Sequence, residues 1–95
     1  TAAGFGHFAR EKVDFAVVEV GMGGRLDATN VIRPEVSVIT RVDFDHVERL
    51  GTTLRKITWE KAGIIKPGVP VVSAPQDNEA RAVIEDVASR RSAAV

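Results

Sequence analysis

The sequence predicts an α/β fold in which three layers are built around a parallel sheet. Apolar, β-branched runs of strand length recur at 13–20, 36–40 and 69–73. Apolar residues at helical spacing follow the second and third runs, over 53–66 and 78–91. Strands that alternate with helices are joined by right-handed crossovers, which make the sheet parallel and gather ligands at the C-terminal ends of its strands.

The first half of the chain contains two predicted strands and the loop between them. Residues 4–12 can close a helix, and 13–20 is then a nearly continuous apolar run, which is typical of a strand buried on both faces. A polar, glycine-rich loop follows at 21–30. Pro34 introduces the second strand at 36–40, so the residues directly after it are expected at the C-terminal edge of the sheet.

The second half is predicted to contain a helix, a strand and another helix. A Lys-Pro-Gly sequence ends the helix over 53–66, because proline removes a backbone donor and glycine supplies a flexible position. The run 69–73 forms the third strand. Asp77 is expected to cap the last helix, over 78–91, whose apolar residues fall on one side.

Composition narrows the class of protein. The 95 residues are 44% hydrophobic with no net charge, which describes a globular chain of one domain or less. Zero net charge gives no electrostatic footprint of a nucleic-acid binder, and no apolar run approaches the ~20 residues that span a membrane. The absence of cysteine excludes a disulfide scaffold and fits a cytoplasmic protein. The chain opens on Thr1 in helix-like sequence, so we interpret 1–95 as an internal fragment.

Lys61 occupies a position where the predicted helix should carry an apolar side chain. It lies four residues after Ile57 and four before Ile65, which places it on the face predicted to be buried. An ammonium group against apolar surface either extends to water or loses basicity, and an uncharged lysine can react with carbon dioxide to give a carbamate. Both interpretations remain open from the spacing. Trp59 falls off this face and is expected to anchor a neighbouring element.

Glu19 is a candidate metal ligand. It lies near the end of the first predicted strand, among valines, where a carboxylate must be paired, neutral or bound to a metal. A buried ion pair, for instance with Arg25, is the structural alternative. The sequence does not decide between the two.

His46 follows the second predicted strand, so parallel neighbouring strands would bring it close to Glu19. Magnesium prefers oxygen ligands, so a histidine ligand requires oxygen ligands beside it. Here these are the carboxylate of Glu19 and a carbamate oxygen from Lys61. Asp43 and Asp45 are alternatives to His46 as ligands, or they cap the loop.

The glycine-rich loop 21–30 lacks the GxxxxGK[ST] pattern of a phosphate-binding loop. Its glycines instead favour a tight backbone path that presents Arg25 and Asp27 at the edge of a cleft, with Asn30 as a loop cap. A local salt bridge between Arg25 and Asp27, which would shape the loop, is the alternative.

Three segments carry motifs in a fixed order: VEVGMGGRLDATNVI at 18–32, TRVDFDHVERLG at 40–51 and WEKAGIIKPGVPVV at 59–72. Together they resemble the central ATP-binding domain of the Mur ligase family, in the branch that contains folylpolyglutamate synthase and dihydrofolate synthase. The resemblance covers nearly everything from 13 to 75. It implies an α/β domain of the P-loop type.

The resemblance also implies roles for single residues. The glutamate of the EVGxGGRLDATN motif and the histidine of the DH motif are magnesium ligands in that family, and they correspond to Glu19 and His46. The lysine of EKAGIIKPG is carbamylated in the family and corresponds to Lys61. Arg41 and Asp43 depart from the small or neutral residues of relatives and add two opposite charges near this region.

The activity that the resemblance implies is an ATP-dependent amide ligase, which adds L-glutamate to a folate or to dihydropteroate through an acyl phosphate, with Mg²⁺ as cofactor. In the family the LDA segment lines the pteroate pocket, which implicates Leu26, Asp27 and Ala28. The family's P-loop and C-terminal domain are expected outside this fragment, so the fragment alone should be inactive and the full-length enzyme a monomer. The alternatives are a non-catalytic scaffold or interaction domain, and another Mur-type ligase.

Overall fold

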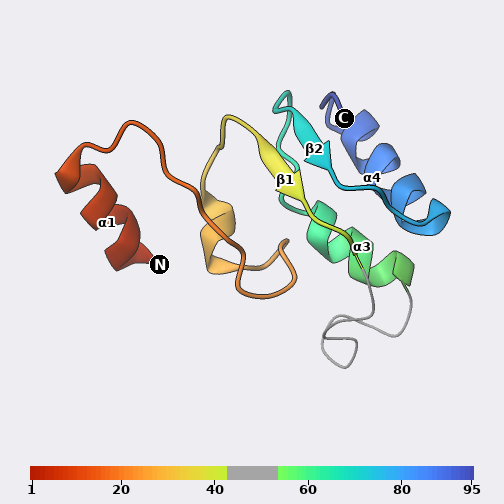
Figure 1. The fold of residues 1–95 in the computed structure, drawn as a ribbon, viewed down its shortest axis with the longest axis horizontal. Coiled ribbons are helices and arrows are strands. Elements are labelled where there is room, and N and C mark those ends of the chain that lie inside the picture. Colours follow the sequence, from red (N-terminus) through yellow and green to blue (C-terminus); the bar gives the residue numbers. More distant parts are fainter. Residues whose placement is uncertain (43–53) are drawn as a thin grey trace.

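The computed structural model describes residues 1–42 and 54–95. The elements, in chain order, are α1 (Ala2–Glu11), the 3-10 helix η1 (Ala28–Val31), β1 (Ser37–Ile39), α3 (Leu54–Ala62), β2 (Val71–Ser73) and α4 (Asn78–Arg90) (Figure 1). The predictions for Asp43, Asp45 and His46 lie outside the described residues.

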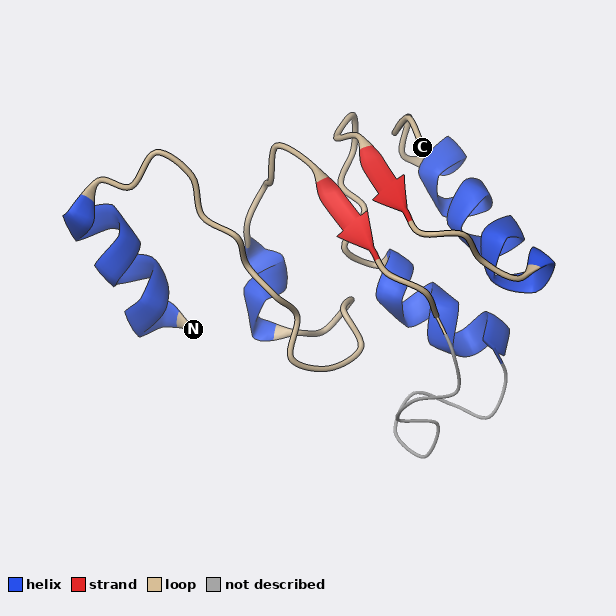
Figure 2. Cartoon of the chain, viewed as in Figure 1, coloured by secondary structure: helices blue, strands red, loops and turns tan. Residues whose placement is uncertain are grey.

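A pair of parallel strands forms the sheet in the described part of the chain (Figure 2). The register sets Ser37 opposite Val71 and Val38 opposite Val72. Successive side chains of a strand point to opposite faces, and the burial follows this rule. Ile39 and Val71 are buried on one face, whereas Val38 and Val72 are each 57% exposed on the other. The predicted second and third strands are therefore confirmed, each in shorter form.

Helices α3 and α4 cover the buried face of this sheet and pack against each other. The buried residues of α4 recur at intervals of three and four, as an amphipathic helix requires: Ala80, Val83, Ile84, Val87 and Ala88. Ile57 is the central residue of α3 in this core and is fully buried. Burying a side chain of this size contributes roughly 1.5–3 kcal/mol, so the two helices and the sheet stabilise one another.

The α/β class and the parallel sheet of the sequence prediction are confirmed. Of the three predicted layers, the described residues form two, a helical layer and a sheet. No described helix covers the face that carries Val38 and Val72. Helix α1 lies at the far end of the molecule from α4 and has no buried residue (Figure 1). None of the described helices has the length and apolar character needed to cross a membrane.

The predicted first strand, 13–20, is wrong for the described structure. This segment is extended but belongs to no strand, and Val17 is 97% exposed. An apolar run becomes a strand only when a neighbouring strand satisfies its backbone hydrogen bonds, and none of the described strands lies beside it. Glu19 is exposed as well, which corrects its predicted burial among valines.

Helix α3 ends at Ala62, four residues before the predicted end at Lys66. The backbone N–H groups of residues 63–65 each donate to the carbonyl three residues earlier, so the last turn tightens instead of continuing as α-helix. Ile65 therefore does not extend the helical face of Ile57. Lys61 was predicted on the buried face of the helix, and the structure places it half-buried in the last turn.

Asp77 stands at the N-cap of α4, as predicted, but its side chain makes no capping hydrogen bond. Its carboxylate instead accepts a hydrogen bond of 3.0 Å from Nη2 of Arg41. Gln76 adds to this tie, because its side chain accepts from the N–H of Val42 at 2.9 Å and donates to the carbonyl of Thr40 at 2.9 Å. The end of β1 is thereby fastened to the loop that precedes α4.

A substitution at Gly63 tests the close approach of the glycine-rich loop to the end of α3. A Cβ at this position would lie 2.3 Å from Cβ of Arg25, which is far inside contact distance. We expect Gly63→Ala to destabilise the protein by about 1–3 kcal/mol, because the facing loop must move. Gly4→Ala is the control, since a Cβ there meets nothing within 4 Å and alanine favours a helix. The measurement is the urea midpoint of unfolding, and equal midpoints for Gly63→Ala and wild type would contradict the close approach.

Candidate functional site

The carboxylate of Asp27 holds the glycine-rich loop together. Oδ1 accepts hydrogen bonds from the N–H groups of Gly21 at 3.2 Å and Met22 at 3.3 Å. Oδ2 accepts from the N–H of Thr29 at 3.0 Å and from its hydroxyl at 2.5 Å. The Thr29 hydroxyl, then the backbone N–H groups of Thr29, Met22 and Gly21, hold the pKa of Asp27 below its usual value, because they stabilise the charged form.

Through these bonds Asp27 acts as a clasp, meaning that its carboxylate joins residues 21 and 22 at the start of the loop to residue 29 near its end. Asp27 is also the N-cap of η1. Its two oxygens already accept four hydrogen bonds, which is close to the capacity of a carboxylate. Its neighbours differ, since Leu26 is 79% exposed and Ala28 is exposed. The prediction that Leu26, Asp27 and Ala28 line a substrate pocket stays a prediction. The geometry adds that Asp27 shapes the loop which presents the other two.

The loop lies directly against the last turn of α3. Gly24 has a φ of +150°, which disfavours any residue with a side chain, and a Cβ there would lie 2.9 Å from the carbonyl oxygen of Glu60. The same Cβ would lie 3.1 Å from the carbonyl oxygen of Lys61. The N–H of Arg25 donates to the Glu60 carbonyl at 2.8 Å. The glycine therefore allows a backbone contact that connects the loop to the turn carrying Lys61.

The side chain of Arg25 joins the same turn. Its Nη2 and Nε donate to Oε1 and Oε2 of Glu60 at 3.1 and 3.3 Å, and its guanidinium carbon lies 4.6 Å from the ring centroid of Trp59. The expectation that Trp59 anchors a neighbouring element is confirmed. Arg25 forms its ion pair with Glu60, so the two partners considered from sequence, Glu19 and Asp27, are not the ones the structure shows.

Asn30 closes the contact from the other side. Its Nδ2 donates to the carbonyl of Arg25 at 3.0 Å and to the carbonyl of Gly63 at 3.1 Å. Nζ of Lys66 donates in turn to the carbonyl of Asn30 at 2.6 Å. Asn30 is thus the loop cap that the sequence predicted, and it also satisfies a carbonyl at the end of α3. Sequence reasoning missed this second role because positions 30 and 63 are distant in the chain.

The predicted metal ligands are only partly placed. Glu19 lies two residues before the start of the loop's tight turn and is exposed to solvent. Among residues 1–42 and 54–95, no group of three or more His, Cys, Asp or Glu is arranged to hold a metal ion. His46 lies outside the described residues. The carboxylate of Glu19 is of the oxygen type that Mg²⁺ prefers, and shared coordination with His46 and Lys61 stays a prediction.

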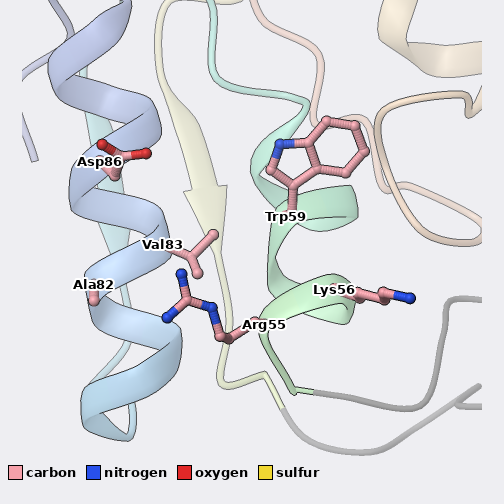
Figure 3. Close-up of a pocket in the computed structure, with 6 residues that line it drawn as sticks. All are labelled: Arg55, Lys56, Trp59, Ala82, Val83 and Asp86. Carbon is pink, nitrogen blue, oxygen red and sulfur yellow. The ribbon is translucent and has the colours of Figure 1, made fainter.

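A shallow groove of about 310 Å³ runs between α3 and α4 (Figure 3). Its lining residues are Arg55, Lys56, Trp59, Ala82, Val83 and Asp86. In Figure 3 the side chain of Lys56 points away from α4. None of the predicted site residues lines this groove, so the chemistry of the chain is better sought at the loop.

The comparisons with known proteins agree with this fold. The Mur ligase middle domain matches residues 2–95, and the chain therefore belongs to the Mur ligase family. Within that family the similar proteins are folate enzymes. The dihydrofolate synthase/folylpolyglutamate synthase of Bacillus subtilis is 49% identical over 94 residues, which are 98% of this chain and 22% of that protein.

Solved structures show the same relationship. The apo form of Lacticaseibacillus casei folylpolyglutamate synthase superimposes with a TM-score of 0.96 at 45% identity, covering 98% of this chain and 23% of that one. A complex of folylpolyglutamate synthase with AMPPCP and folate gives a TM-score of 0.90 at 46% identity, covering 92% and 21%. The chain thus spans about a fifth of the length of these relatives. The resemblance inferred from the three motifs is confirmed.

The titration of Asp27 tests its role as the clasp of the loop. Because its pKa is lowered in the folded state, Asp27 contributes stability above the ordinary pKa of 3.8, and this stability is lost as the pH falls through the lower folded value. Thr29→Val removes the largest cause while keeping the side-chain shape. We expect the pKa of Asp27, measured by carboxyl NMR, to rise toward 3.8 in this variant. Thr40→Val is the control, and an unchanged pKa in Thr29→Val would contradict the assignment.

Proposed function

We propose that the full-length protein containing this chain is an ATP-dependent amide ligase that joins L-glutamate to a folate or to dihydropteroate. The observation that carries the proposal is the 49% identity to a dihydrofolate synthase/folylpolyglutamate synthase over 98% of the chain. The fit to a folylpolyglutamate synthase complex with AMPPCP and folate supports ATP and a folate as substrates. The loop geometry supports it as well, since the loop presents the segment expected to line the acyl-substrate pocket.

The proposed reaction has two steps. A carboxylate of the acyl substrate attacks the terminal phosphate of ATP, the bond from that phosphate to ADP breaks, and an acyl phosphate forms. The amine of glutamate then attacks the acyl carbon, phosphate leaves, and the amine loses a proton as the amide forms. Negative charge accumulates around the phosphates, and bound Mg²⁺ would offset it.

In this proposal Glu19, His46 and carbamylated Lys61 hold the metal and do not transfer protons. Carbamylation changes the side chain of Lys61 from a cation to an anion, which supplies an oxygen ligand where an ammonium would repel the metal. The position of Lys61 supports this role, because the half-buried last turn of α3 lies against the glycine-rich loop.

Leu26, Asp27 and Ala28 line the acyl-substrate pocket in the proposal. The exposed side chains of Leu26 and Ala28 are free to contact an aromatic ring system, while Asp27 keeps the loop closed. An apolar side chain beside a flat heterocycle removes both surfaces from water, which favours binding.

We further propose that the parts of the longer relatives outside this chain supply the P-loop for ATP phosphates and the C-terminal domain for glutamate. The chain spans 22% of the Bacillus subtilis relative, which supports this division. In this proposal the 95 residues alone are inactive. We also propose that the full-length enzyme is a monomer and acts in the cytoplasm.

The direct test is a ligase assay on the full-length protein with ATP, L-glutamate and each acyl substrate in turn. We expect ADP and phosphate release that requires all three substrates, with a glutamylated folate or a dihydrofolate as the product. Turnover with a different acyl acceptor would favour another Mur-type ligase. No turnover with any acceptor would favour a non-catalytic scaffold.

Variants of Lys61 test the proposed carbamate. Lys61→Arg keeps a positive charge but cannot form this carbamate, and Lys61→Ala removes both groups. Both should lose at least about 100-fold in kcat, as expected when a metal is misplaced. Small carboxylates should partly restore Lys61→Ala by occupying the vacated space. Lys56→Arg, an exposed position on the same helix, is the control and should keep normal activity.

Near-normal turnover of Lys61→Arg would rule out the carbamate. Lys61 would then be an unmodified lysine, whose aliphatic chain packs along the protein surface and whose ammonium group is solvated.

A further inference from the structure

Arg25 binds the last turn of α3 with both its backbone and its side chain. The N–H donates to the Glu60 carbonyl at 2.8 Å, and the guanidinium donates to both Glu60 carboxylate oxygens at 3.1 and 3.3 Å. The face of the guanidinium lies over Trp59, 4.6 Å from its centroid. A planar guanidinium can make a forked ion pair and a ring contact at once, which a lysine ammonium cannot.

The two residues of this ion pair are the chain neighbours of the proposed functional residues. Arg25 directly precedes Leu26, the first residue of the proposed acyl-substrate segment, and Glu60 directly precedes Lys61. The pair bridges 35 positions of sequence. It therefore fixes the distance between the proposed substrate loop and the proposed metal ligand at the point where the two elements meet.

The side-chain pair is not what keeps the loop folded. The glycine contacts at Gly24 and Gly63, the Arg25 N–H bond and the Asn30 bonds do not involve the guanidinium. The side chains of Arg25 and Glu60 are 39% and 22% exposed, and ion pairs in such partly solvated places contribute little to global stability. Their effect is to restrict how the loop lies on the helix.

We propose that Arg25 is a positioning residue for the ligase reaction, which clamps the acyl-substrate loop onto α3 and so sets the substrate in register with Lys61. The proposal rests on the function proposed above. Loss of the guanidinium leaves these backbone and Asn30 bonds in place but removes the restraint that the ion pair and the ring contact add, which permits a small shift of the segment beginning at Leu26. A shift of this kind would move the acyl carboxylate relative to the terminal phosphate of ATP and would leave the ATP site, which is proposed to lie outside this chain, in place.

Steady-state kinetics of the full-length enzyme test the proposal. For Arg25→Ala we expect kcat to fall about 10- to 100-fold and KM for the acyl substrate to rise, because misplacement of about 1 Å has effects of this size. KM for ATP should stay within about twofold of wild type. Arg25→Lys keeps the positive charge but cannot make the forked ion pair, so its kcat should lie between those of wild type and Arg25→Ala.

Arg81→Ala is the matched control, because Arg81 makes a 3.9 Å pair with Glu85 on the surface of α4, away from the loop. It should match wild type in kcat, in KM for the acyl substrate and in KM for ATP.

The double variant Arg25→Glu with Glu60→Arg should recover part of the kcat that each single variant loses, since the ion pair re-forms with its charges reversed. Acrylamide quenching of Trp59, taken as the difference from Trp59→Phe, should rise in Arg25→Ala because the ring loses its cover.

The outcomes separate the two proposals. Suppose that the wild-type enzyme ligates glutamate. If Arg25→Ala then has the same kinetic parameters as wild type, or if it raises KM for ATP as much as KM for the acyl substrate, only the positioning role is overturned. Failure of the reversed pair to recover any activity also overturns it. A wild-type protein that does not ligate glutamate to a folate overturns the proposed function, and the positioning role falls with it.

Discussion

The docking of the glycine-rich loop on the last turn of α3 is the contact on which the candidate site depends. A helix leaves its last carbonyls without intrahelical donors. Here the N–H groups of residues 63–65 donate to the carbonyls of Glu60, Lys61 and Ala62, and other elements supply donors to the Glu60 carbonyl and to the carbonyls of residues 63–65. The loop donates from Arg25 and Asn30, the start of β1 donates from Ser37 to the Ile64 carbonyl at 3.1 Å, and the end of α4 donates from Arg91 to the Ile65 carbonyl. Loop, sheet and second helix therefore meet at residues 60–65, and the two glycines allow the chain segments to approach closely enough to do so.

This contact brings together residues with proposed functions that lie far apart in the sequence. The loop presents Leu26 and Ala28, while the helix end carries Lys61, and Asp27 holds the loop in the shape that the helix receives. A closely packed junction of this kind suits the proposed chemistry, since a phosphate of ATP and an acyl carboxylate must be held at reacting distance. The groove between α3 and α4 is shallow and lacks these residues, which is why the site is assigned to the junction.

Sequence reasoning predicted the elements that depend on local patterns and failed where the cause is tertiary. The strands around Val38 and Val72 and the helix α4 follow from apolar runs and spacing, and the three motifs predicted the family. The early end of α3 was not predicted, and neither was the approach of Arg25 to the Gly63 that follows it, 38 positions away in the chain. The segment 13–20 reads as a strand, but a strand also requires a neighbour that periodicity does not reveal. The ion pair of Arg25 with Glu60 and the hydrogen bond from Asn30 to the Gly63 carbonyl were missed because the partners lie 35 and 33 positions apart in the chain.

Hydrogen exchange at the backbone amide of Arg25 in the full-length protein tests the central claim most directly. This amide belongs to an exposed loop residue, yet it donates to the Glu60 carbonyl at 2.8 Å beneath the glycine contact. If the loop is docked as described, the amide exchanges as slowly as the amides in the buried turn of α3 around Ile57, because both open only when the junction opens. Exchange at the rate of an unstructured peptide would show that the loop is not held on the helix and would contradict the account.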